Sequence, residues 1–302
     1  MNRFLNLRRR LCFLLSGACL AAAGCAALAE PLSPADVASQ YRLQVDKRLE
    51  LPAEERRRYV QLAEATLQGA AAAPVRAQWL FVVDRSPWVQ AGLLYWRSAT
   101  ADYVFAGASP VSTGRPGEFD HFDTPLGVFP HTVANPDFRA EGTFNENGIR
   151  GYGIKGMRVF DFGWQRVPKG WGDGTVIEMR LQMHATDPDA LESRLGSAQS
   201  KGCIRIPATL NRFLDHYAIL DAEYEEHLGA GRKQWVLREN REPVSDPGHF
   251  LVIIDSGRSD RPDWSPAPYI PHRAPVRATP RPAPLPPASP RPVPPPAAPI
   301  RR

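Results

Sequence analysis

The residues best suited to chemistry are a cysteine and a histidine that lie 19 positions apart. Cys203 stands in the run Ser-Lys-Gly-Cys-Ile-Arg at residues 200–205, and His184 precedes it. A cysteine attacks carbonyls as its thiolate, and a nearby imidazole can take the thiol proton. The other three cysteines lie within the first 29 residues, so Cys203 is the single thiol of the remaining chain. This pattern makes Cys203 a candidate nucleophile.

The neighbours of Cys203 offer further functional groups. Gly202 lets the backbone approach a reacting carbonyl, and amide groups beside it could form an oxyanion hole. Lys201 could add positive potential, and Arg205 could anchor a carboxylate or brace the loop. Taken singly, each residue also has a structural explanation. A zinc site is disfavoured because paired spacing such as Cys-x-x-Cys is absent from the sequence, and we expect neither a metal nor a cofactor.

The elements that position these residues follow from the hydrophobic pattern. Residues 176–184 alternate between apolar and polar side chains, which predicts a strand with His184 on its polar face at the end. A turn-rich loop over 185–199 leads to Cys203, and apolar residues between 210 and 217 predict a helix after it. Further strands are predicted at 79–83, 92–96, 103–105 and 250–254.

Upstream of these strands, the sequence is helical in pattern. A Ser-Pro cap at 33–34 is followed by apolar residues every four positions from Val37 to Leu49, and a second helix is predicted after Pro52. We expect these helices to form a helical hairpin over 30–75, before a mostly β catalytic domain over 76–255. The aromatic stretch at 160–171 is expected to pack in the core, with a lid as the alternative.

Both ends of the chain differ in composition from the middle. Residues 1–29 have a basic start, an apolar stretch and an Ala-Leu-Ala site, which predicts a cleaved signal peptide. Lipidation of Cys25 is an alternative, less favoured because residue 22 is Ala rather than Leu. Residues 256–302 form a Pro/Arg-rich segment that predicts a disordered tail, either a spacer or a tether to anionic cell-wall polymers.

The net charge of +5 comes from the ends of the chain. Residues 1–29 contribute four arginines and no acid, and residues 256–302 contribute eight arginines against two aspartates. The part between is therefore net negative, which argues against nucleic-acid binding. No segment after residue 29 is apolar for long enough to suggest a transmembrane span.

Two blocks of the sequence resemble the signature of the L,D-transpeptidase (YkuD-type) family. The first is His-Ala-Thr at 184–186, a spacer, and Ser-Lys-Gly-Cys-Ile-Arg at 200–205. The second is Val-Ser-Thr-Gly at 111–114 with Asp-Thr-Pro-Leu-Gly-Val-Phe at 123–129. The resemblance covers about 76–255. Two positions depart from the pattern, since Lys201 stands where the family has histidine and Ala185 where it has glycine.

The resemblance implies a β-sandwich or barrel-like catalytic domain with flanking helices, acting on peptidoglycan stem peptides. Cys203 would attack the donor tetrapeptide and release its terminal D-Ala, and an amine on a neighbouring stem would resolve the thioester into a 3-3 cross-link. His184 would serve as general base and acid. Other positions are expected to form the oxyanion hole or pocket (Gly202, Ser200, Arg205, Lys201) or a possible substrate cleft (Ser112, Thr113, Gly114, His121, Thr124).

Two alternatives to a transpeptidase stay open. Water in place of the amine would give a hydrolase that trims stem peptides or releases wall-linked protein. A non-catalytic wall-binding module is disfavoured, because binding requires neither a thiol nor a base. For each of these three functions we expect the protein to be located in the periplasm or cell envelope. His131, also near the upstream block, is expected to be structural, and a structural role is favoured for His121 as well.

Overall fold

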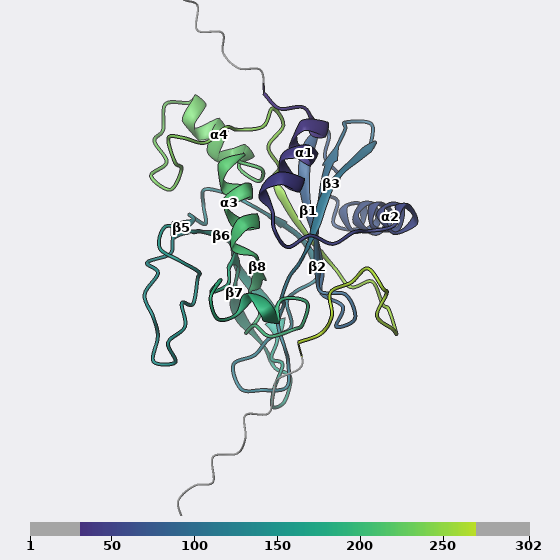
Figure 1. The fold of residues 1–302 in the computed structure, drawn as a ribbon, viewed down its shortest axis with the longest axis vertical. Helices are drawn as coiled ribbons and strands as arrows, with labels where there is room; N and C mark the ends of the chain where they lie inside the picture. The colour runs from purple at the N-terminus through teal and green to yellow at the C-terminus, as the bar shows by residue number, and fades with distance from the viewer. Residues whose placement is uncertain (1–30, 270–302) are drawn as a thin grey trace, which may run out of the picture.

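The computed structural model describes residues 31–269, which fold into two sheets and four α-helices (Figure 1). The fold is mixed, with more strand than helix, so the strand-rich prediction is confirmed at that level. Within residues 31–269 neither sheet closes into a barrel. None of the helices in this range combines the length and apolar character needed to cross a bilayer.

The first sheet has five strands in the order β3-β2-β1-β9-β4. β1 pairs antiparallel with β2 and parallel with β9, and β9 lies inside the sheet between β1 and β4. Four of these strands, β1, β2, β3 and β9, were predicted from the sequence, whereas β4 was not. Their bounds are β1 Gln78–Asp84, β2 Ala91–Arg97, β3 Tyr103–Pro110, β4 Gly127–Pro130 and β9 Phe250–Ile254.

The second sheet has four strands in the order β5-β6-β7-β8. β7 is the predicted strand that ends near His184, and it pairs antiparallel with β6 and parallel with β8. The aromatic stretch at 160–171 mostly belongs to β6, with Phe160 and Phe162 in the core as expected. The bounds are β5 Phe138–Arg139, β6 Arg158–Pro168, β7 Val176–Ala185 and β8 Ile204–Ile206.

The four helices cover the sheets. α1 begins with a capping box in which the Ser33 and Asp36 side chains each bond the other residue's backbone N–H. α3, the helix predicted after Cys203, packs against β6, β7 and α1. The bounds are α1 Pro34–Gln44, α2 Ala53–Gly69, α3 Ala208–His216 and α4 Ala222–Gly229, with a 3-10 turn at Glu192–Arg194.

α1 and α2 form close to where the sequence predicts them, but they do not make the expected hairpin. Tyr41 of α1 belongs to the core between the sheets, whereas Tyr59 of α2 belongs to a second core cluster on the other face of the first sheet. Figure 1 shows α1 and α2 on opposite sides of this sheet. α1 ends at Gln44, and the connecting segment runs past the sheet edge, where the Leu49 N–H donates to the Ala108 carbonyl. Each helix therefore finds its apolar partner in the sheet.

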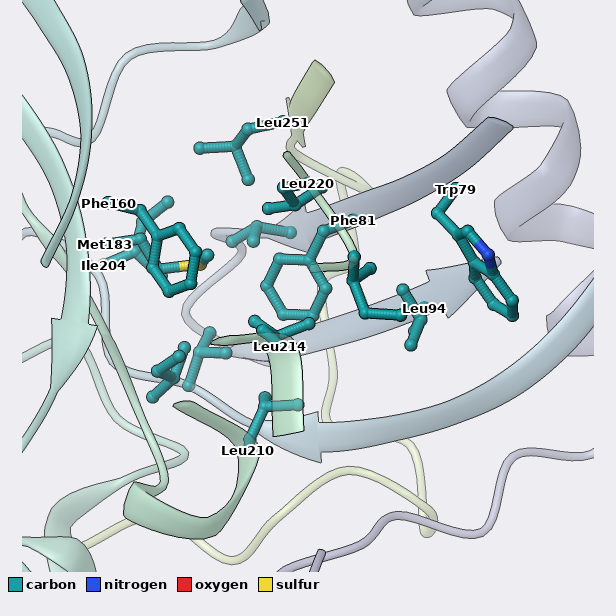
Figure 2. Close-up of a cluster of buried hydrophobic side chains, with 14 of the residues drawn as sticks. Trp79, Phe81, Leu94, Phe160, Met183, Ile204, Leu210, Leu214, Leu220 and Leu251 are labelled. Carbon is teal, nitrogen blue, oxygen red and sulfur yellow. The ribbon is translucent and has the colours of Figure 1, made fainter. Parts of the chain in front are cut away.

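The main core lies between the two sheets. Figure 2 shows Phe160, Met183 and Ile204 of the second sheet facing Phe81, Leu94 and Leu251 of the first, with Leu210 and Leu214 of α3 beside them. These side chains are almost completely buried. At roughly 25 cal/mol per Å² of apolar area, such burial is the main favourable term in folding.

Residues 256–269 differ from the expected disordered tail. Trp264 packs edge-on against Tyr59 of α2, with ring centroids 5.8 Å apart. Arg258 pairs with Glu55, and the Tyr269 N–H donates to Ser197 Oγ at 2.7 Å. This stretch thus joins α2 to the loop that leads to Cys203. The rest of the predicted tail, 270–302, and the predicted signal peptide, 1–29, lie outside the described residues.

A buried ionic cluster ties β5 and β6 to the start of α4. Arg158 donates to Asp137 and Asp221 at 2.6 Å each, and all three side chains are fully buried. His131 contacts the Leu220 carbonyl through Nδ1 at 2.8 Å and Asp137 through Nε2 at 2.9 Å. Both partners can only accept, so both ring nitrogens donate and the ring is cationic. His131 is therefore structural, as expected.

Removal of Arg158 should destabilise the fold strongly. Arg158→Met leaves Asp137 and Asp221 buried without their main cation, so we expect the free energy of unfolding to fall by about 3–5 kcal/mol. The matched control is Arg76→Met, which breaks the exposed Arg76–Glu226 pair and should cost less than about 1 kcal/mol. Urea unfolding followed by circular dichroism measures both. Equal losses in the two variants would contradict this role for Arg158.

Candidate active site

The pairing of β7 with β8 determines which side chains meet at the candidate site. Met183 is in register with Ile204, and His184 with Arg205. Because side chains alternate across a sheet, Met183 and Ile204 point into the core while His184 and Arg205 share the opposite face. Cys203 comes directly before β8 and falls on that same face. The strand pairing thus places the two sequence-predicted catalytic residues on one face of the sheet.

The Cys203 thiol is free and half-buried over the backbone of β7. Its Sγ atom lies 3.8 Å from the Arg180 carbonyl oxygen. Burial raises the pKa of the thiol above its ordinary value, and the Asp161 carboxylate acts in the same direction. The backbone N–H of Gln182 and the guanidinium of Arg205 lower this pKa but do not outweigh burial. Cys203 is therefore a thiol at neutral pH.

His184 is held in one tautomer. Its Nδ1 atom lies 2.8 Å from the Ala185 carbonyl oxygen, which can only accept, so Nδ1 carries the proton and Nε2 is the basic atom. The residue is 4% exposed, and burial lowers the pKa of His184 to about 4. The Ala185 carbonyl opposes this shift and Arg205 adds to it. The imidazole is consequently neutral at neutral pH.

The resting site thus pairs a neutral thiol with a neutral imidazole rather than a thiolate with an imidazolium. Such a pair suits general-base catalysis, in which the proton leaves Cys203 as its sulfur attacks. The low pKa of His184 also means that the proton it gains is readily given to a leaving amine. These are the protonation states that an acyl exchange with general-base catalysis would need.

The Cys203 loop (residues 195–203) is fixed by hydrogen bonds. Ser200 Oγ donates to the Cys203 carbonyl at 2.5 Å and accepts from the Gly202 N–H at 3.0 Å. Thr124 Oγ1 donates to the Gly202 carbonyl at 2.7 Å and accepts from the Gly114 N–H at 2.9 Å. Gly202 has a φ of +127°, and a Cβ there would lie 2.9 Å from the Met179 side chain. Glycine is therefore required at 202.

The upstream sequence block supports this loop from inside. Ser112 forms backbone hydrogen bonds with Arg205, and its hydroxyl donates to the Ser197 carbonyl. Thr113 bonds Gln90 through both its backbone and its hydroxyl. Ser112, Thr113 and Thr124 are each at most 1% exposed. The expected substrate cleft is therefore not lined by these side chains, which brace the Cys203 loop instead.

Two other expected site residues bond to the segment at 118–120. Lys201 pairs with Asp120 at 2.7 Å, with its side chain 62% exposed, so its charge is neutralised at the surface. His121 contacts the Phe119 carbonyl through Nδ1. The cation that lowers the thiol pKa is instead Arg205. Asp120 lies 81 positions before Lys201 in the sequence, so the residues around Lys201 could not indicate this ion pair.

Four residues that the sequence did not single out surround the site. Asp161, 1% exposed, accepts from Arg180 Nε at 2.7 Å and Gln182 Nε2 at 2.8 Å. Tyr152 donates to Gln182 Oε1 at 3.3 Å, and its ring meets that of His184 edge-on, with centroids 4.7 Å apart. Of these four residues, Asp161 alone could have been noticed in the sequence, because it is an acidic residue within the apolar run of β6.

The Tyr152 groove adjoins this region through the Tyr152 side chain. It is an open cavity of about 480 Å³, lined by residues 138–143 and 151–153. Since Tyr152 also contacts His184, the groove lies beside the proposed base. Within residues 31–269, no group of three or more His, Cys, Asp or Glu side chains is arranged to hold a metal ion.

Comparison with known proteins adds no assignment. No model of a known protein family matches this chain, and no curated protein is significantly similar to it.

Alkylation of Cys203 should report its raised pKa. The rate constant for iodoacetamide should still be rising at pH 9, the ordinary pKa of a cysteine, because the thiolate is the reactive form. Asp161→Asn should move the midpoint to lower pH, since it removes a carboxylate that raises the pKa. Intact-mass kinetics across pH measure both. A rate plateau between about pH 5 and 8 would instead indicate a thiolate–imidazolium pair.

Proposed function

We propose that this chain is an exported, cysteine-dependent L,D-transpeptidase that acts on peptidoglycan stem peptides, with a catalytic domain of the L,D-transpeptidase type. The observation that carries the proposal is the register of β7 and β8, which sets His184 and Cys203 on one face outside the core. The two sequence blocks that resemble the family also meet in space, since Thr124 and Gly114 bond the Cys203 loop. Binding alone would need neither the thiol nor its neutral base.

In the first half-reaction, Cys203 Sγ attacks the carbonyl of a donor stem while His184 Nε2 takes the thiol proton. The resulting tetrahedral intermediate collapses with cleavage of the peptide C–N bond. His184 then passes its proton to the leaving amine, and the terminal D-Ala departs. These steps leave a thioester on Cys203 and His184 neutral again.

In the second half-reaction, an amine of a neighbouring stem attacks the thioester. His184 removes the amine proton, and the Cys203 sulfur leaves and regains a proton. The product is a 3-3 cross-link or another amide. The backbone N–H of Gly202 already donates to Ser200 Oγ, so it is not a free oxyanion donor in this structure. The Gln182 N–H, which lowers the pKa of Cys203, faces the sulfur instead.

Hydrolysis of the same thioester is the second candidate. The Tyr152 groove is open to solvent, and Tyr152 contacts His184, so water could serve as the acceptor in place of an amine. Both reactions use the same acyl-enzyme, and they differ only in the acceptor. We place either reaction in the periplasm or cell envelope, where its substrate lies.

A carbapenem should acylate Cys203 once. β-Lactams carry a strained amide carbonyl, and a competent thiol–imidazole pair should open it to a stable thioester. Intact-mass analysis should show a single adduct that is absent from Cys203→Ala. Muropeptide profiles of cells expressing each form then distinguish 3-3 cross-linking from stem trimming. An unmodified wild-type protein together with identical profiles would refute the enzyme proposal.

The pH dependence of this acylation should reflect the low pKa of His184. The base must be neutral to act, and it stays neutral above its pKa of about 4. The acylation rate constant should therefore be constant between about pH 5.5 and 7.5. It should fall as pH drops toward 4. His184→Ala should lower the rate constant about 10²–10⁴-fold. A half-maximal rate near pH 6.5 would contradict the buried, neutral base.

A further inference from the structure

Arg205 differs from the other largely buried arginines in its lack of an acidic partner. Arg97 pairs with Glu64, Arg139 with Asp215 and Arg158 with two aspartates. Within residues 31–269, no carboxylate lies within salt-bridge distance of Arg205. Its single side-chain hydrogen bond runs from Nη1 to the Gln199 carbonyl at 3.4 Å, which is long for such a bond.

The position of Arg205 is set by the same register that forms the site. Arg205 lies on β8, opposite His184 of β7. It follows Cys203 by two residues, so the Cα atoms of Cys203 and Arg205 are about 6–7 Å apart along the strand. From this position beside both residues, its charge lowers the pKa of Cys203 and of His184. A substrate bound at the thiol would therefore meet this cation.

The other charges near the thiol are already neutralised. Arg180 is paired with Asp161 beneath the site, and Lys201 is paired with Asp120 at the surface. Burial and the nearby Arg194 both lower the pKa of Arg205, so its surroundings disfavour the cation. A largely buried cation without a counter-charge is costly to the fold. An anion supplied from outside would relieve that cost.

The guanidinium is also accessible. The buried polar side-chain atoms without a partner in residues 31–269 belong to other residues, such as Arg158 and Asp221. The N–H groups of Arg205 that lack a partner are not among these atoms, so they are not completely sealed from solvent and can bond a ligand. A guanidinium binds carboxylates through paired N–H groups, which favours a carboxylate over a diffuse anion.

We propose that Arg205 is a specificity-determining residue that binds a substrate carboxylate lying within one residue of the carbonyl attacked by Cys203. The identity of the donor as a peptidoglycan stem rests on the proposed function, but the anion site does not. The acyl donor is then a peptide that carries a free carboxylate beside the scissile bond, and a donor with a carboxamide there is a poor substrate.

Two alkylating probes test the anion site without any enzymatic turnover. Iodoacetate and iodoacetamide react alike, since the Cys203 sulfur displaces iodide, forms an S–C bond and loses its proton to buffer. They differ in that iodoacetate is an anion. Arg205→Gln should lower the ratio of the iodoacetate to the iodoacetamide rate constant about fivefold. The iodoacetamide rate also shows whether the thiol of the variant stays native.

Matched variants separate the site from nearby charge in general. Arg205→Lys keeps the cation and should restore much of the ratio. Lys201→Gln removes a cation two residues from Cys203 that is paired with Asp120, and its ratio should equal that of the wild type. An unchanged ratio in Arg205→Gln, or an equal drop in Lys201→Gln, would overturn the proposal.

A measurement on the wild-type protein covers the case in which Arg205→Gln does not fold. N-acetyl-D-alanine should protect Cys203 from iodoacetamide at a concentration about fivefold lower than its carboxamide requires. Equal protection by both would overturn the anion site. Acylation by donor tetrapeptides ending in carboxylate or carboxamide then tests the link to stem peptides. If neither donor acylates Cys203 while the iodoacetate ratio behaves as expected, the proposed function fails and the anion site stands.

Discussion

The short parallel pairing of β7 with β8 is the interaction on which the site depends. Three residue pairs define it, from Met183–Ile204 to Ala185–Ile206, and the core positions among them are fully buried. A one-residue slip of β8 against β7 would turn Arg205 toward the core and Ile204 away from it, while His184 stayed on its own face. The hydrophobic core between the sheets therefore fixes the candidate catalytic face, because burial of one set of side chains leaves the alternate set on the opposite face.

The electrostatics of the site follow from the same burial. Burial holds His184 neutral and Cys203 protonated, so neither residue carries charge before substrate binds. The cost of a buried thiolate–imidazolium pair is avoided, and proton transfer waits for the attack. Arg205 is then the unneutralised charge beside the thiol. A site of this kind would couple recognition of an anionic group to chemistry on the neighbouring carbonyl.

Many helices and strands of the fold could be predicted because the periodicity of apolar residues along the chain indicates each of them. The alternation in residues 176–184 gave β7, and the spacing from Val37 gave α1. Periodicity does not indicate which element an apolar face packs against. The prediction that α1 and α2 form a hairpin was therefore wrong. Cys203 and His184 followed from residue type and spacing. Tyr152 and the Lys201–Asp120 pair depend on contacts between distant segments, and no local pattern marks them.

The most direct test is to look for the acyl-enzyme itself. The protein is mixed with a synthetic donor tetrapeptide, quenched in acid, and its intact mass is measured with peptide mapping of the modified residue. We predict a thioester on Cys203 that adds the mass of the donor minus that of the released D-Ala, and no such species in His184→Ala. Consumption of the donor by Cys203→Ala at the wild-type rate, with no acylated wild-type protein, would contradict it.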